Sequence, residues 1–331
     1  MQAINRWFSE NIQALARDMR WSYLPPLMVY VAAGIQGLTG IVGTFFVKDY
    51  LGLSAEFLAA LGFWAFVPWS LKMPIGHLVD LIWRFKAWLV ILGAALIATS
   101  LLIMAALIGN REWMASLWSL NAWYVLAALL SPVGYVLQDV VADAMTVEAV
   151  PNVDSRGQPT PRDQLKRMHT TMQTLGRVAI IGGTVLVALI NLWVFKGSDA
   201  LPAAEKLVLY RNVYLMALVI PVVSVMGLVS AALIHQRQVD TLVRSGLSRA
   251  EALSRLRPAL EKTTPNWWIL GGSLVFVSLT LTLGMSDWTY SQEAIFLGST
   301  AIILWLMKRL VADLDPRARQ TLVGTAVVIF L

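Results

Sequence analysis

Four charged side chains lie inside apolar stretches of the sequence, where a charge is costly to place. They are two basic residues, Lys72 and Arg177, and two acidic residues, Asp139 and Asp143. If those stretches cross a bilayer, each charge costs at least about 2.5–3.5 kcal/mol, so it is expected to face the interior of a helical bundle and to pair. Such residues are candidates for binding a charged solute or for carrying a proton.

The two aspartates have a spacing with a chemical consequence. Asp139 and Asp143 are four residues apart, so an α-helix presents both carboxylates on one face. Like charges this close favour protonation of one of them, and a carboxylate that gains and loses a proton can act as a proton carrier. Arg177 cannot lose its proton to escape the cost of burial, so it is expected to have an anion nearby.

We predict that Lys72, Arg177 and Asp139 form one charge cluster on the inner face of a helical bundle. In this cluster Lys72 and Arg177 attract a carboxylate, while Asp139 exchanges a proton or locks the resting state by pairing. The competing interpretation is that these groups, Asp143 included, lie near the interface, where they snorkel to water or hold helices together and bind nothing.

The first apolar segment is rich in glycine, with Gly34, Gly37, Gly40 and Gly43 around Gln36. Small residues let membrane helices approach closely, so close packing is one interpretation. The other is a mobile helix that lines a substrate path, in which Gln36 donates a hydrogen bond to the ligand.

The elements that must position these residues are membrane-spanning helices. The chain is 57% hydrophobic and only 14% charged, with a mean hydropathy of +0.65, whereas soluble domains are about a quarter charged. Apolar runs of the length that crosses about 30 Å of hydrocarbon recur along the sequence, and they predict an all-α integral membrane fold. The predicted segments are 24–47, 54–79, 86–109, 114–143, 168–195, 207–235, 267–285, 290–310 and 321–331.

The last of these segments is too short to cross a bilayer, and the sequence is therefore expected to be truncated. Residues 1–235 are predicted to form a complete six-helix bundle, 236–266 a basic cytoplasmic linker with an amphipathic helix, and 267–331 a further hairpin and the start of a ninth span. Six helices followed by a long basic linker is the layout of one half of a two-bundle transporter. Segments 267–310 are either an inserted pair or the beginning of the second half.

Basic residues orient the predicted helices, because cytoplasmic loops carry the excess of lysine and arginine. With the N-terminus in the cytoplasm, most of the 26 basic residues fall on the inner side. The outer side then holds only Lys48, Arg111, Lys196, Lys206 and Arg211. The sequence predicts a multi-pass protein of the cell membrane, and of the inner membrane in a bacterial cell.

Two groups of residues carry a resemblance to known families. Gly76, Asp80 and Arg84 resemble the loop between the second and third helices of the major facilitator superfamily, and they are candidates for a conformational loop. The run 68–72 that ends in Lys72 and the run 138–144 with its paired aspartates resemble the folate-biopterin transporter family and the related muropeptide permeases. The resemblance covers roughly residues 24–190, and Gln138 is nearer to the permeases.

The resemblance implies a major-facilitator-type bundle that works by alternating access. The expected function is proton-coupled symport of a small polar or anionic solute, with a folate- or pterin-like solute as the first candidate. The alternatives are a muropeptide-type permease and a non-transporting membrane receptor or assembly protein. The sequence contains no His-Glu-x-x-His zinc site, no Gly-x-Ser-x-Gly elbow and no phosphate-binding glycine loop, so no enzymatic activity is expected. The expected partners are the solute, protons and the lipid bilayer, with no cofactor, metal or nucleic acid, and the protein is expected to be a monomer.

Overall fold

The computed structural model describes residues 14–151, 153, 158–256, 264–286, 288–312 and 314–330. These residues are almost entirely α-helical; apart from an isolated bridge between Val153 and Pro159, the described part contains no β-structure. Within the described residues, eight helices are long and apolar enough to cross a membrane, which is consistent with the predicted all-α membrane helix bundle.

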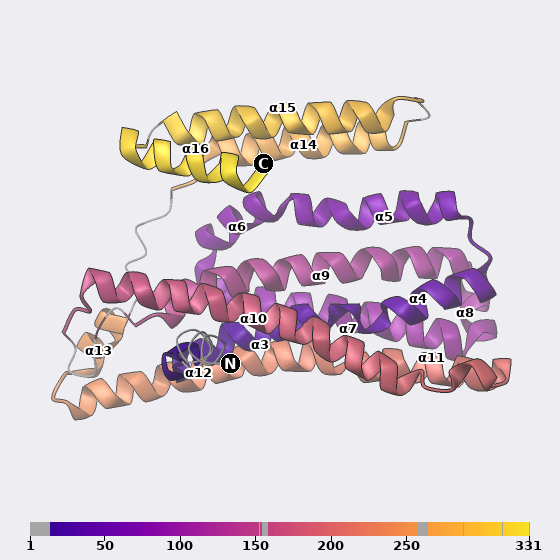
Figure 1. The fold of residues 1–331 in the computed structure, drawn as a ribbon, viewed down its shortest axis with the longest axis horizontal. Helices are drawn as coiled ribbons and strands as arrows, with labels where there is room; N and C mark the ends of the chain where they lie inside the picture. Colours follow the sequence, from indigo (N-terminus) through magenta and orange to yellow (C-terminus); the bar gives the residue numbers. More distant parts are fainter. Residues whose placement is uncertain are drawn as a thin grey trace, which may run out of the picture. The chain divides into compact units, whose positions relative to one another are not determined.

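The chain divides into two compact units, which are considered separately. The first contains residues 1–72 and 82–262, and Figure 1 shows its long helices running along one direction, with α13 at one end and α8 at the other. The second contains residues 73–81 and 263–331. The membrane-crossing helices are Trp21–Phe46, Ala55–Leu81, Trp83–Gly109, Leu120–Ala149, Arg162–Val194, Ala203–Arg244, Trp267–Gly284 and Ser291–Ala312.

The predicted boundaries differ from the observed ones where a polar residue changes the local structure. The fourth span, α9 (Leu120–Ala149), begins later than predicted because Arg111–Leu117 forms a separate short helix, α8. Ser119 then caps α9, its hydroxyl accepting a hydrogen bond from the main-chain N–H of Ala122. The fifth span, α10 (Arg162–Val194), starts six residues before the predicted position.

Glycine pairs set the closest helix crossings of the first unit. A Cβ added to Gly34, in α3 (Leu24–Gly34), would lie 2.4 Å from the main-chain oxygen of Ile180 in α10. Gly183 of α10 faces Gly34 at the same crossing. Gly93 of α7 (Lys86–Gly109) and Gly134 of α9 meet in the same way. The main chains therefore touch at these crossings, so the packing interpretation of the glycine-rich first segment holds at Gly34.

The first span is not a continuous α-helix. Residues Ile35–Thr39 form a 3₁₀ segment, η3, between α3 and α4 (Gly40–Phe46). Gln36 and Gly37 are exposed within it, and a Cβ at Gly40 would meet nothing within 4 Å. Close packing does not explain Gly40, and a 3₁₀ stretch inside a long helix often marks a hinge.

The predicted linker begins later than residue 236. The sixth span consists of α11 (Ala203–Ala217) and α12 (Val219–Arg244), so the predicted boundary at 235 falls inside a helix. A short helix, α13 (Arg249–Leu256), folds back so that Ala252 is buried against Val239 and Leu242 of α12. The apolar face of the amphipathic segment packs on protein, and that contact extends α12 beyond the apolar run.

Helix α13 begins with a capping box formed by Ser248 and Glu251. The Glu251 carboxylate accepts hydrogen bonds from the main-chain N–H and the hydroxyl of Ser248, and the Ser248 hydroxyl accepts one from the N–H of Glu251. These hydrogen bonds lower the pKa of Glu251 from its ordinary value. The carboxylate is therefore ionised at neutral pH and holds the start of the helix.

The second unit is built around the hairpin of α14 (Trp267–Gly284) and α15 (Ser291–Ala312), which lie side by side. Small residues let them approach: a Cβ at Gly272 would lie 2.8 Å from Leu306, and one at Gly298 would lie 2.6 Å from Leu279. The main-chain N–H of Asn266, at the start of α14, donates to Nε2 of His77 in the same unit at 2.8 Å. The last described helix is α16 (Pro316–Phe330).

Candidate functional site

Lys72 lies between the two aspartates of α9. Its Nζ is 2.5 Å from Oδ2 of Asp139 and 2.8 Å from Oδ2 of Asp143. Pro68 lies inside α5 (Ala55–Ser70) and Leu71 interrupts the helix, so that Lys72 is the first residue of α6 (Lys72–Leu81). The i, i+4 spacing of the aspartates places both carboxylates within reach of one ammonium group.

The three side chains differ in their access to solvent. Asp139 is buried, with 9% of its side chain exposed, whereas Lys72 is 40% and Asp143 48% exposed. Asp139 therefore depends on Lys72 for neutralisation, because an unpaired buried carboxylate is unfavourable. Within the described part of the chain, the Asp143 side chain is accessible to water or to a solute.

Tyr30 is a member of this group that the sequence alone did not reveal. Its hydroxyl, carried by α3, donates a hydrogen bond of 2.5 Å to Oδ1 of Asp143. The carboxylate thus binds Lys72 with one oxygen and Tyr30 with the other. The sequence offers one signal for it, a tyrosine inside an apolar span, but that signal is weak because tyrosine is common in such helices.

Arg177 approaches the same group from α10. It is exposed, and among the described residues no carboxylate forms an ion pair with it. It is still near enough to act electrostatically on both Asp139 and Tyr30. We refer to Lys72, Asp139, Asp143, Tyr30 and Arg177 as the charge cluster.

The charge cluster joins four helices of the first unit. α3, the start of α6, α9 and α10 each contribute to it, and α9 packs against α3, α5 and α10. Gln173, one turn before Arg177, donates a hydrogen bond of 3.4 Å to Oγ1 of Thr146 on α9. The cluster holds two cations and two carboxylates, so it is electrically neutral when both carboxylates are ionised.

Gln138 precedes Asp139 in the sequence, and its hydrogen bonds connect helices. It is buried, its Nε2 donates to the main-chain oxygen of Val90 at 3.3 Å, and its Oε1 accepts from the hydroxyl of Ser224 at 2.9 Å. One amide thereby ties α7, α9 and α12 together. Its described contacts are therefore those of a residue that holds helices together.

The other predicted site residues take no part in the described ion pairs and hydrogen bonds of the charge cluster. Gln36 is exposed in η3 and takes no part in the cluster's described hydrogen bonds. Gly76 and the exposed Asp80 belong to the second unit, while Arg84 belongs to the first, with its guanidinium 4.5 Å from the centre of the Phe85 ring. The predicted conformational loop is thus divided between the two units.

A second polar network, absent from the sequence prediction of site residues, joins the ends of α7 and α9. Glu148 accepts a hydrogen bond of 2.6 Å from Nε1 of Trp83 and forms an ion pair with Lys86. The Lys86 ammonium also lies 4.3 Å from the centre of the Trp83 ring. This network fixes the end of α9 only a few residues beyond Asp143.

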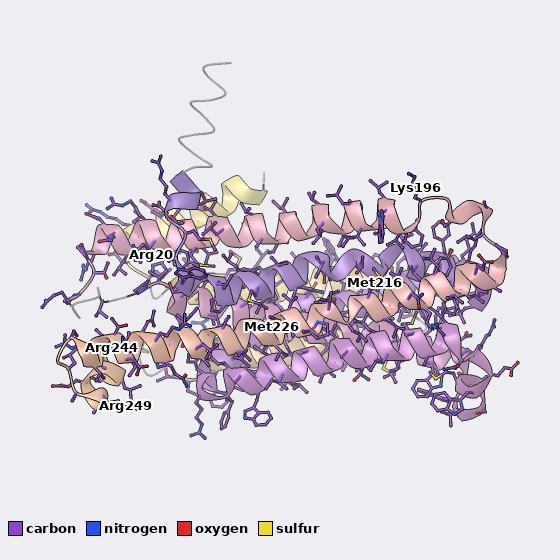
Figure 2. All side chains as sticks on the ribbon, turned by 90° about the horizontal axis from the view of Figure 1, so that it is seen from below. Arg20, Lys196, Met216, Met226, Arg244 and Arg249 are labelled. Carbon is purple, nitrogen blue, oxygen red and sulfur yellow. The ribbon has the colours of Figure 1, made fainter. Side chains whose placement is uncertain are left out.

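Four labelled basic residues of the first unit lie toward the two ends of its helices. Figure 2 shows Arg20, Arg244 and Arg249 toward one end of the helices and Lys196 toward the other. The first three belong to the predicted inner set and Lys196 to the predicted outer set.

No group of three or more His, Cys, Asp or Glu side chains that could hold a metal ion occurs among the described residues.

Part of the chain is similar to a transporter. Over 184 residues it is 26% identical to a folate-biopterin transporter of Synechocystis sp., an alignment that covers 55% of this chain and 33% of that protein. The chain thus matches about a third of the relative's length. No protein-family profile matches the chain, and no solved structure matches it. The similarity suggests a transporter family, and a transporter is not an enzyme.

Proposed function

We propose that this chain forms the first helical bundle and the following spans of a secondary transporter of the major facilitator type, which moves a small anionic solute together with protons. The observation that carries the proposal is the sharing of Lys72 by Asp139 and Asp143, with Arg177 nearby and without a described ion pair. The similarity to a folate-biopterin transporter supports the same function class. In this proposal the bundle ends with α12, and the segment around α13 links it to the hairpin.

The charge balance of the cluster links solute binding to proton uptake. An anionic solute competes with Asp139 and Asp143 for the Lys72 ammonium, and Arg177 provides a second cation for it. When Lys72 turns to the solute, two carboxylates four residues apart lose their shared cation. Protonation of one of them removes the repulsion and the cost of an unpaired buried charge. Binding of the anion therefore favours uptake of a proton.

The solute class follows from the charges and from the relative's name. Two cations, one exposed and one half-exposed, suit a solute that carries carboxylates, as folate does. The named relative transports folate or biopterin, so a folate- or pterin-like solute is the first to test. A muropeptide is the alternative solute, and the helix-packing hydrogen bonds of Gln138 do not discriminate between the two.

The proposal is tested by uptake of labelled folate into cells or vesicles that contain the natural protein, with and without a proton gradient. Lys72→Ala and Asp139→Asn are compared with Lys196→Ala, a lysine at the end of the first unit opposite to Arg20, Arg244 and Arg249 (Figure 2). We expect gradient-driven uptake in the wild type and in Lys196→Ala, and its loss in Lys72→Ala. Asp139→Asn is expected to retain binding but to lose the response to the gradient.

Each other outcome contradicts a separate part of the proposal. Uptake by the wild type that is insensitive to Lys72→Ala and Asp139→Asn would refute the charge cluster as the coupling site. Uptake without a response to the gradient would refute proton coupling. Absence of folate uptake by a folded wild type would refute the folate-type solute and direct the assay to peptidoglycan fragments.

A further inference from the structure

An aromatic groove lies on the second unit, between the start of α14 and the end of α15. Its volume is about 530 Å³, within the range of roughly 300–1,000 Å³ that is typical of small-molecule sites. It is lined by Trp267, Trp268, Gly271, Gly272, Val275, Ala301, Ile302 and Trp305. All of these residues belong to the same unit, and none is charged.

The groove is formed by one stripe of each helix. On α14 the lining residues recur at i, i+1, i+4, i+5 and i+8, and on α15 at i, i+1 and i+4, which are the positions of a single helix face. Glycine at 271 leaves the floor open, because a Cβ there would meet nothing within 4 Å. From Trp267 to Val275 the groove runs about 12 Å along the helix axis.

Two basic residues continue the α15 stripe beyond the groove. Lys308 and Arg309 lie three and four residues after Trp305, on the same face, and both are exposed. The Arg309 guanidinium lies 4.8 Å from the centre of the Trp268 ring, which in turn packs edge-on against Trp305 at 5.3 Å. Among the described residues no carboxylate forms an ion pair with Arg309, so its N–H groups are available to an anion.

The arrangement combines an apolar slot with a cationic end at the level of a tryptophan belt. Tryptophan is enriched where hydrocarbon meets the headgroup region, so Trp267, Trp268 and Trp305 place the mouth of the groove at that depth. Basic pockets between membrane helices bind anionic headgroups. Asn266 already accepts hydrogen bonds from the first-turn N–H groups of Trp268 and Ile269, so the positive charge for such a headgroup comes from Arg309 and Lys308.

We propose that this groove binds an anionic phospholipid, with an acyl chain between α14 and α15 and the phosphate beside Arg309. A packed helix of a second copy would match the apolar stripe but would leave Arg309 and Lys308 without an anion. A zwitterionic lipid would match the slot but would gain less from the two cations. The charge at the mouth therefore selects the anionic lipid.

Native mass spectrometry of the purified chain tests the proposal, with dioleoyl phosphatidylglycerol and dioleoyl phosphatidylcholine as probes. Gly271→Leu places an apolar side chain in the groove, and its Cβ meets no atom within 4 Å. Gly182→Leu is the matched control, since Gly182 is an exposed helix residue in α10 whose added Cβ also meets nothing within 4 Å. We expect tighter retention of phosphatidylglycerol, its loss in Gly271→Leu, and wild-type retention in Gly182→Leu. Arg309→Gln is expected to lower the affinity for phosphatidylglycerol about fivefold and to leave phosphatidylcholine unchanged.

Three results would overturn the proposal. Equal retention of the two lipids would reduce the groove to an unselective apolar surface. Equal retention by Gly271→Leu and Gly182→Leu would place the lipid elsewhere. Dimers of the wild type that disappear in Gly271→Leu would assign the groove to a second copy of the chain.

Discussion

Lys72→Met tests directly whether one ammonium group serves two carboxylates. Methionine keeps most of the apolar stem of the lysine, so the change removes the charge with little loss of packing. Both contacts of Nζ disappear together, the one of 2.5 Å to Asp139 and the one of 2.8 Å to Asp143. Asp139→Asn is milder, because Lys72 keeps its contact with Asp143.

The expected magnitude follows from burial. Removing one partner of a fully buried ion pair costs about 3–5 kcal/mol, since an uncompensated charge stays behind. Here only Asp139 is buried, while Lys72 is 40% and Asp143 48% exposed, so water screens part of the interaction. We therefore expect Lys72→Met to lower the free energy of unfolding by about 1–3 kcal/mol. Asp139→Asn is expected to lower it by about 1 kcal/mol or less.

Thermal unfolding in detergent, followed by tryptophan fluorescence, measures these changes. A loss of 1–3 kcal/mol corresponds to a fall in Tm of roughly 2–10 °C. The double variant Lys72→Met/Asp139→Asn leaves no buried charge unpaired, so it is expected to be about 1–2 kcal/mol more stable than the sum of the single losses predicts. Losses that simply add in the double variant would refute the shared ion pair.

Three further predictions test other parts of the structure. Gly34→Ala forces a Cβ against a main-chain oxygen of α10 and is expected to lower the free energy of unfolding by about 1–3 kcal/mol. The Cβ of Gly40→Ala meets no atom within 4 Å, so this variant is the control. Equal Tm values for the two variants would contradict the close crossing. Tyr30→Phe removes the hydrogen bond to Asp143, so it is expected to lower the free energy of unfolding by about 1 kcal/mol and to shift the pH profile of uptake. An unchanged pH profile would show that Tyr30 has a packing role only. Folding lowers the pKa of Glu251, so its carboxylate stabilises helix α13 fully above the ordinary value of 4.5, and this stabilisation is lost as the pH falls through the lowered pKa. Hydrogen-exchange protection of α13 should fall in that pH range in the wild type. Glu251→Gln should show no such step.

Features that depend on neighbouring residues in the sequence could be predicted. The apolar runs gave the eight membrane-crossing helices, because burial in hydrocarbon requires length and composition that are visible locally. The common face of Asp139 and Asp143 followed from helix periodicity. The end of the sixth span could not be found in this way, because α12 continues to Arg244 beyond the apolar run, where Val239 and Leu242 pack with Ala252 of α13.

Partners that are distant in the sequence required the structure. Tyr30 and Asp143 are 113 residues apart, and nothing in either segment marks the other as its hydrogen-bond partner. The facing of Gly34 and Gly183 likewise depends on how α3 and α10 cross. The charge at Lys72 could be predicted to need a partner, but its sharing by two carboxylates follows from the geometry of the α5–α6 junction and α9.

The 3₁₀ segment Ile35–Thr39 limits what one side of the first span can face in a bilayer. Its main-chain groups keep i→i+3 hydrogen bonds, but the exposed Gln36 side chain carries an amide that is costly to place in hydrocarbon without a partner. The side that exposes Gln36 is therefore expected to face protein or water. A lipid-soluble photoreactive probe should leave Gln36 unlabelled while it labels the opposite face of the helix. This short segment therefore defines how the first span is rotated about its axis in the membrane.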